Sequence, residues 1–223
     1  DAVGTAAFPN DELLLEGFWG ALGNLFSLLV TIALLYPLSN GVKQLVSEKE
    51  SKMRQVMMIM SLRTDALFLS WALHFLALFF PLSLVLTLAA KSLFEYSDYG
   101  QIFSYFFFFF VSAMSYFGFI SVFFSQPKTA SIIGSMSFFV GYLLYIGVEN
   151  AGISRAVAFI CCLHPATAFT FGTLAFQEWE DVQIGVTQET AGRSQLYVIT
   201  FSEVIGMMIF DTVYLNILTA YFG

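Results

Sequence analysis

The chain has 223 residues, of which 58% are hydrophobic and 11% are charged, and it carries 27 Phe and 10 Tyr. Soluble domains are about one quarter charged, so this composition excludes a soluble globular protein and indicates a membrane protein with several spans. The net charge of −7 excludes little, because the placement of Lys and Arg matters more than their sum in membrane proteins.

Residues 1–17 are acidic and contain no Lys or Arg, so they do not resemble a signal peptide. A first apolar segment at about 18–38 is long enough to cross about 30 Å of hydrocarbon as a helix. Ser39, Asn40 and Gly41 then predict the end of this helix. Because the chain starts and stops abruptly, we expect it to be a piece of a longer protein.

Residues 47–61 form the one long segment that is both charged and helical in pattern. Ser47 and Glu50 have the spacing of a capping box, which predicts that a new helix starts there. Two acid–base pairs, spaced four residues apart with the acid first, support this helix: Glu48–Lys52 and Glu50–Arg54. An apolar stripe covers one face of the helix, and it consists of Met53, Val56, Met57 and Met60. We therefore predict an amphipathic helix rather than a span.

Four further spans are predicted at about 65–90, 101–124, 129–148 and 201–221. Pro81 predicts a bend within the first of these segments. Small residues in 129–148 let neighbouring helices approach closely. The run Phe106 to Phe110 in 101–124 predicts a wall that faces lipid.

The placement of Lys and Arg predicts the orientation in the membrane. The basic segment 43–63 is expected to be cytoplasmic, which puts the N-terminus and the acidic loop 95–98 outside. Residues 152–177 leave two alternatives, because a crossing would move the acidic loop 178–200 to the cytoplasm and a re-entrant hairpin would keep it outside. Two half-helices of about 11 residues, broken at His164-Pro165, each reach about half of the bilayer, so we favour the hairpin.

The predicted fold is therefore an all-α polytopic membrane protein. It has five transmembrane helices, a cytoplasmic amphipathic helix at 47–61 and an external re-entrant hairpin at 152–177. The helix at 47–61 has two interpretations, as a segment lying on the bilayer or as a contact surface for a cytoplasmic partner. Its mixed charge favours a partner over a lipid surface.

The sequence gives little support to a catalytic site or a metal site. The chain has no GxxxxGK[ST] loop, no GxSxG elbow and no HExxH motif. Cys161, Cys162 and His164 lack a fourth candidate ligand in an apolar setting, so we predict buried side chains at a helix break instead of a metal site. We expect no catalytic, cofactor or metal site on this chain and no nucleic-acid partner.

Two polar residues inside predicted spans carry the remaining candidates for function. A carboxylate such as Asp211 near mid-membrane costs a few kcal/mol unless it is paired or hydrated, so it is expected to face the interior of the bundle. It either hydrogen-bonds a neighbouring span or forms a polar point beside a substrate route. His74 is expected to be an interhelical hydrogen-bonding group or a proton carrier, and Glu203, near the external edge, is expected to be solvated.

The segment VSEKESKMRQVMMIMSLRTDALFLSW resembles a stretch of the A subfamily of ATP-binding-cassette transporters. The triplet Glu48-Lys49-Glu50, the step Met60-Ser61-Leu62 and Trp71 stand at the matching positions. LHPATAFTFG at 163–172 and MMIFDT at 207–212 are similar to further stretches of that family. The sequence departs from the family pattern with Ser61 where Gly is usual and with His164 where Ser is usual.

The resemblance implies a transmembrane domain of the A/G exporter type in an ATP-driven transporter of lipids or lipid-like molecules. Residues 1–17 would end an external domain, and residues 18–223 would supply spans two to six of one half. A cytoplasmic nucleotide-binding domain would contact the helix at 47–61, with coupling carried by Glu48, Lys49, Glu50, Lys52, Arg54 and Met57. ATP and Mg²⁺ would bind outside this chain, and a second transmembrane domain and membrane lipids would be further partners. The location would be the plasma membrane or an endomembrane.

Two other functions remain open at the level of the residues. One is an ion channel or proton-linked carrier that uses Asp211 and His74. The other is a membrane assembly subunit without transport of its own. A channel would line its pore with several polar side chains, and the predicted spans offer few of them.

Overall fold

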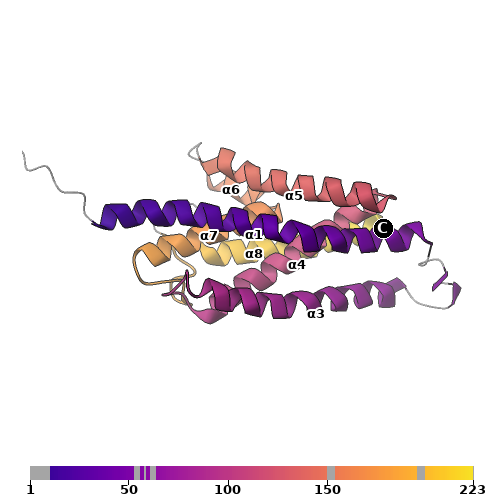
Figure 1. Ribbon diagram of the computed structural model, residues 1–223, viewed down its shortest axis with the longest axis horizontal. Helices are drawn as coiled ribbons and strands as arrows, with labels where there is room; N and C mark the ends of the chain where they lie inside the picture. Colours follow the sequence, from indigo (N-terminus) through magenta and orange to yellow (C-terminus); the bar gives the residue numbers. More distant parts are fainter. Residues whose placement is uncertain are drawn as a thin grey trace, which may run out of the picture.

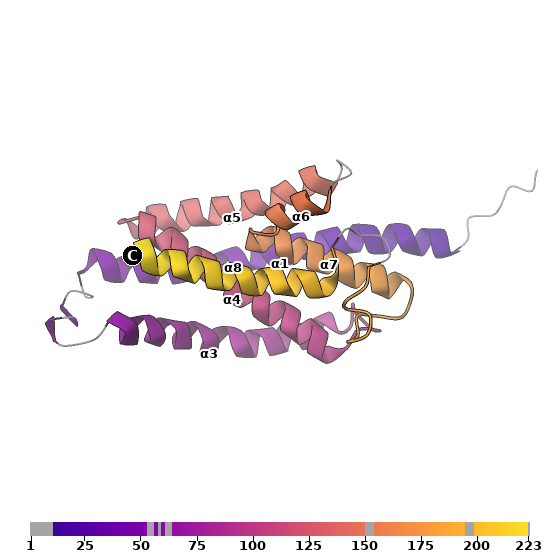
Figure 2. The ribbon, with the colours of Figure 1, turned by 180° about the vertical axis from the view of Figure 1, so that it is seen from behind.

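The computed structural model describes residues 11–52, 56–57, 59–60, 64–149, 154–194 and 199–222. Within these residues the chain contains no strand, which confirms the predicted all-α class. The helices are α1 Asp11–Glu50, α3 Thr64–Ala90, α4 Tyr99–Phe123, α5 Pro127–Glu149, α6 Arg155–Cys161, α7 Pro165–Asp181 and α8 Phe201–Phe222. The long helices lie side by side in one elongated bundle (Figures 1 and 2).

Helix α4 is central to this bundle, because it packs against α8, α3, α1 and α7. Its aromatic run does not form a wall facing lipid, and that prediction was wrong. Phe106, Phe109 and Phe110 are fully buried. Phe109 stacks on Phe169 of α7 with ring centroids 4.1 Å apart, and Phe110 stacks on Phe79 of α3 at 5.1 Å. Three of the five phenylalanines therefore belong to an aromatic core between helices, while Phe107 and Phe108 are partly exposed.

Helix α1 is one continuous helix of 40 residues, so the predicted helix end at 39–41 and the predicted helix start at Ser47 were both wrong. The physical reason is packing. Leu38, Val42 and Val46 recur every four residues, and all three are fully buried against the bundle. Burial of this stripe outweighs the local stop signal, since tertiary packing routinely overrides propensity. The rest of the predicted helix at 47–61 lies partly outside the described residues.

Gly41 marks a close approach between helices rather than a helix end. A Cβ atom added at Gly41 would lie 3.2 Å from Cε1 of Phe75 on α3 and 3.6 Å from Cε of Met114 on α4. The first distance is tight for a real Cβ atom, and the second is an ordinary van der Waals contact. The glycine thus lets α1 pass close to side chains of its two neighbours.

Among the described residues, four helical segments are long and apolar enough to cross a membrane. They are Leu25–Glu50, Leu69–Ala90, Tyr99–Phe123 and Phe201–Phe222. The fifth predicted span, at 129–148, corresponds to α5, a helix of 23 residues that is not among these four. A total of five transmembrane helices therefore stays a prediction.

The segment predicted as a hairpin consists of two helices of unequal length. The chain breaks between Cys161 and Pro165, and Pro165 occupies the start of α7, where a missing backbone N–H costs nothing. The prediction of two halves of about 11 residues was wrong, since α6 has 7 residues and α7 has 17 and extends to Asp181. Almost every residue of α7 is buried, so this helix is part of the core.

Both ends of the α6–α7 segment lie at the same end of the bundle (Figures 1 and 2). Arg155, at the start of α6, pairs with Glu203 at the start of α8. After α7, Val186 N donates to Ser97 Oγ at 2.8 Å, and Asp98 N donates to Val186 O at 3.1 Å. The segment therefore enters the bundle and returns to the loop 95–98. Its position relative to a membrane stays a prediction.

Two glycines let the hairpin pack against its neighbours. A Cβ atom at Gly141 of α5 would overlap the ring of His164, and one at Gly172 of α7 would overlap the ring of Tyr105 of α4. Thr167 Oγ1 donates to Gly141 O at 2.7 Å, and the Tyr105 hydroxyl shares a hydrogen bond of 2.7 Å with Thr173 Oγ1. Close backbone approach and hydrogen bonds therefore hold α7 between α5 and α4.

Candidate functional site

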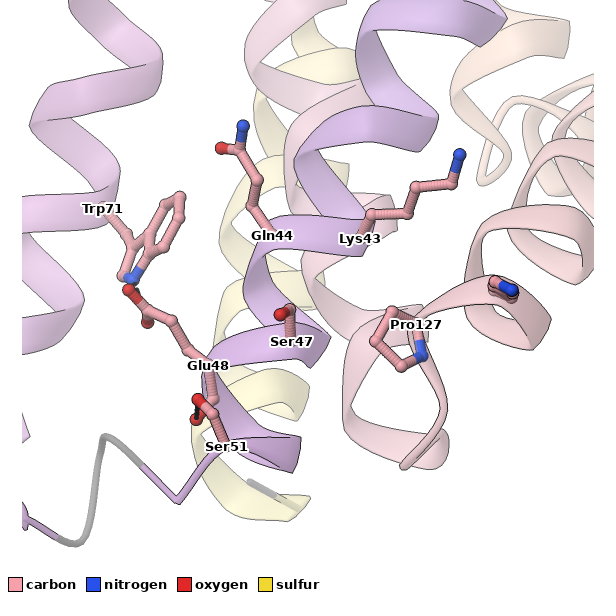
Figure 3. A pocket seen from close by; sticks show the side chains of 8 residues that line it. Lys43, Gln44, Ser47, Glu48, Ser51, Trp71 and Pro127 are labelled. Carbon is pink, nitrogen blue, oxygen red and sulfur yellow. Dashed lines mark hydrogen bonds between the residues drawn. The ribbon is translucent and has the colours of Figure 1, made fainter.

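The end of the bundle that carries residues 43–52, which we call the charged end, contains a pocket of about 540 Å³. Three helices meet there, because the last turns of α1 lie between the first turns of α3 and α5 (Figure 3). The pocket is lined by Lys43, Gln44, Ser47, Glu48, Ser51, Trp71, Pro127 and Lys128. Ser47, Glu48 and Ser51 of this lining belong to the segment 47–61, which the sequence predicts as the contact surface for a partner.

Glu48 links α1 to α3. The indole Nε1 of Trp71 donates a hydrogen bond of 2.8 Å to Glu48 Oε2, as the dashed line in Figure 3 shows. The bond is partly buried and its acceptor is a carboxylate, and such charge-assisted bonds are stronger than neutral ones. The backbone of Glu48 is also engaged, because Ser51 Oγ donates to its carbonyl at 3.3 Å.

The next residue, Lys49, links α1 to α4. Its Nζ donates to the carbonyl oxygen of Val122 at 2.9 Å, in the last turn of α4. A cation is favoured at this position, since the last carbonyls of a helix lack partners and carry the negative end of the helix dipole. Two consecutive residues of α1 therefore contact two different helices.

The other residues predicted to contact a partner show no bond to another helix within the described residues, in contrast to Glu48 and Lys49. Glu50 is exposed at the end of α1, and Lys52 has a φ of 56° in the turn that follows the helix. Met57 is half-buried, and Arg54 lies outside the described residues. Exposed charges after two anchored residues suit a surface that docks against another domain, and this role stays a prediction.

Sequence reasoning did not assign Trp71 and Val122 to the site. Trp71 lies 23 residues from Glu48 along the chain, and Val122 lies 73 residues from Lys49. The contribution of Val122 is a backbone carbonyl, which no residue pattern reveals. The preference of Trp for membrane surfaces is the one available signal for Trp71.

Asp211 lies inside the bundle, fully buried on α8. Neither of its carboxylate oxygens has a hydrogen-bond partner among the described residues, so the structure does not show the expected bond to a neighbouring span. The carboxylate is therefore a buried polar group without a hydrogen-bond partner among the described residues.

His74 does not lie with Asp211. Its side chain is exposed on α3, and its ring contacts the rings of Trp71 and Phe75 on the same helix, with centroids 5.8 Å and 5.5 Å apart. The expected interhelical hydrogen bond of His74 is absent from the described residues. The structure thus gives no support to a proton path that joins His74 to Asp211.

We expect replacement of Asp211 by Leu to raise the free energy of unfolding by about 1–3 kcal/mol, because a buried polar group without a partner is removed. Thermal unfolding of the purified protein measures the effect as a higher Tm. Glu189→Leu, at an exposed acid outside the helices, should leave the Tm unchanged. A lower Tm for Asp211→Leu would show that the carboxylate supports the fold.

The opposite end of the bundle contains polar contacts that the sequence did not reveal. Glu203 was expected to be solvated, and this was wrong. Its Oε2 accepts from Thr200 N at 2.9 Å while Thr200 Oγ1 accepts from Glu203 N at 3.3 Å. This is a capping box, and the spacing of Thr200 and Glu203 was the signal that could have revealed it. Glu203 also pairs with Arg155 and so ties α6 to α8.

Glu180 is the second such contact, and it is almost fully buried at the end of α7. Its carboxylate accepts three hydrogen bonds from the loop after α3. The donors are Tyr96 N at 3.1 Å, Ser97 N at 2.9 Å and Ser97 Oγ at 2.6 Å. Since Ser97 Oγ also accepts from Val186 N, one buried acid holds two loops together.

The thiols of Cys161 and Cys162 are free, and the first is half-buried while the second is buried. Within the part of the chain that the structure describes, no group of three His, Cys, Asp or Glu side chains could hold a metal ion. His164 Nδ1 accepts from Ala166 N at 3.3 Å, so this ring caps α7.

A bundle with four helical segments long and apolar enough to cross a membrane, among the described residues, is the membrane domain of a multi-pass integral membrane protein. The family model described as ABC-2 family transporter protein matches residues 12–221. The chain therefore belongs to the ABC-2 family of transporter proteins, which confirms the class that the sequence motifs predicted.

Several relatives belong to the A subfamily of ATP-binding-cassette proteins. ATP-binding cassette sub-family A member 2 of Rattus norvegicus is 26% identical over 96% of this chain and 9% of its own length. The human phospholipid-transporting ATPase ABCA7 is 28% identical over 92% of this chain and 10% of its own length. The human glucosylceramide transporter ABCA12 is 25% identical over 84% of this chain and 7% of its own length. The chain thus spans at most about a tenth of these relatives.

Proposed function

We propose that the chain is the transmembrane domain of an ATP-driven transporter that moves lipids or lipid-like molecules across or out of a membrane. In this proposal, ATP and Mg²⁺ bind a cytoplasmic nucleotide-binding domain outside this chain. A second transmembrane domain of the same transporter completes the route for the lipid. The charged end of α1 contacts the nucleotide-binding domain and transmits its motion.

One observation carries the proposal for the charged end. Glu48 and Lys49 are consecutive, and they hold Trp71 of α3 and the Val122 carbonyl of α4. A force applied to this turn therefore acts on two further helices at once. The names of the relatives, a phospholipid-transporting ATPase and a glucosylceramide transporter, support lipid as the class of substrate.

We expect the double variant Glu48→Lys and Glu50→Lys to uncouple ATP hydrolysis from transport in the full-length protein. Reversal at Glu48 removes a charge-assisted hydrogen bond, and loss of such a bond costs about 1.5–3 kcal/mol, enough to reduce transport by about tenfold or more. The measurement compares ATPase activity with ATP-dependent movement of a fluorescent phospholipid in proteoliposomes. ATPase activity is retained, and lipid movement is lost.

Two further variants serve as controls. One tests the effect of a reversed charge elsewhere, and the other tests the hydrogen bond between Trp71 and Glu48 alone. Glu95→Lys reverses an exposed acid at the opposite end and should leave coupling unchanged. Trp71→Phe keeps an aromatic ring and removes the donor to Glu48, so it should show a weaker form of the same defect. Unchanged lipid movement in the double variant would refute the proposed role of the charged end.

A further inference from the structure

The pocket at the charged end has cationic groups without partners. Lys43 and Lys128 are exposed, and neither makes a hydrogen bond or ion pair within the described residues, whereas Lys49 is held by the Val122 carbonyl. Figure 3 shows Lys43 and Pro127 on one side of α1 and Trp71 on the other. The one acid of the pocket, Glu48, is turned to Trp71. Within the pocket lining, the side of α1 that faces α5 therefore carries cations and no acid.

Neutral donors lie in the same pocket. Ser47 supplies a hydroxyl, and Gln44 supplies an amide that lies toward Trp71 (Figure 3). Two ammonium groups with neutral donors suit a phosphate, because ammonium groups act as point charges toward phosphate oxygens. The lysines come from two helices, so a phosphate bound by both would contact α1 and α5 together.

Each of these lysines stands at the end of an exposed apolar stripe. On α1 the stripe consists of Leu25, Leu29, Ile32 and Tyr36, and Lys43 follows two turns later on the same face. On α5 it consists of Ile132, Met136 and Val140, spaced four residues apart from Lys128 onward. Helices α1 and α5 pack against each other (Figures 1 and 2), so apolar surface leads up to both cations.

We propose that Lys43 and Lys128 bind the phosphate of an anionic phospholipid, whose acyl chains lie along the exposed stripes of α1 and α5. A lipid fits these observations better than a free phosphate, because each cation continues an exposed apolar stripe that acyl chains can cover. Anionic lipids are enriched in the cytoplasmic leaflet, where the basic end is expected to lie. The inference rests on the proposed orientation and not on ATP-driven transport.

The experiment is a lipid titration of the full-length protein in detergent without nucleotide, read by native mass spectrometry. The probes are dioctanoyl phosphatidylserine, dioctanoyl phosphatidylcholine, glycerophosphoserine and inorganic phosphate. We expect phosphatidylserine to bind more tightly than the other three. Lys43→Gln and Lys128→Gln should each weaken its binding about fivefold, and the double variant should lose one bound lipid.

Charge-conserving variants and a distant variant make the result specific. Lys43→Arg with Lys128→Arg should retain the bound lipid, and Arg193→Gln, which removes an exposed cation at the opposite end, should not change it. All variants should keep the Tm of the unmodified protein, since both lysine side chains are exposed.

Three results would overturn the inference. The first is unchanged phosphatidylserine binding in the Gln double variant, and the second is equal binding of phosphatidylcholine. The third is equal binding of glycerophosphoserine or inorganic phosphate, which would assign the pocket to a soluble phosphate. None of these results depends on ATPase activity or lipid movement, so failure of this inference and failure of the proposed function are distinguishable.

Discussion

Replacement of Glu180 by Ala is expected to lower the free energy of unfolding by about 3 kcal/mol or more, the largest effect of any single substitution considered for this domain. The variant removes three hydrogen bonds to a carboxylate, each worth about 1.5–3 kcal/mol, and leaves two buried donors of Ser97 and one partly buried donor of Tyr96 without this acceptor. The loops after α3 and α7 should separate, and the Tm of the purified protein should fall.

Two variants test the cause of this loss. Glu189→Ala removes an exposed acid from the loop after α7 and should leave the Tm unchanged. Glu180→Gln keeps one oxygen acceptor and should fall between the unmodified protein and Glu180→Ala. A Tm for Glu180→Ala equal to that of Glu189→Ala would mean that the buried carboxylate does not hold the two loops.

Gly172→Ala is expected to destabilise the protein by about 1–3 kcal/mol through overpacking. The added methyl group would overlap the ring of Tyr105, whose hydroxyl bonds Thr173 Oγ1 and the carbonyl of Phe169. The ring is fully buried and stacks on Phe169, so it has no free space to move into. The loss of stability is measured as a lower Tm in thermal unfolding and as a lower yield of monodisperse protein.

Gly206→Ala is the matched control for this substitution. Gly206 lies in helix α8, is exposed and has no atom within 4 Å of an added Cβ. Because alanine has the higher helix propensity, this change should leave the Tm equal or slightly higher. If Gly172→Ala matched Gly206→Ala, the packing of α7 against α4 would not need a glycine.

The positions of most helices were predictable from the sequence, because long apolar runs bounded by turn residues have few alternatives. The segments predicted at 65–90, 101–124 and 201–221 coincide closely with α3, α4 and α8. The break at His164-Pro165 was also visible, since proline lacks a backbone N–H and is favoured at the first position of a helix. These features depend on local chemistry alone.

Features that depend on packing were not predictable. No local feature of the sequence shows that Leu38, Val42 and Val46 are buried. Their burial continues α1 past the helix end predicted at 39–41. A run of phenylalanines suits lipid and a protein core equally well, and its neighbours on α3 and α7 decide between them. The bond between Glu48 and Trp71 joins residues that only the folded bundle brings together.

Pro37 gives the long helix α1 a mechanical weak point. With 40 residues at 1.5 Å each, α1 is about 60 Å long, twice the thickness of the hydrocarbon layer. A proline at position 37 cannot donate to the carbonyl of Ala33, so the rod is stiff on either side and bends most easily there. Glu48 lies about 16 Å further along, so a bend of about 5° displaces it by roughly 1.4 Å. That displacement is enough to break the hydrogen bond between Glu48 and Trp71, while the part of α1 before Pro37 stays in place.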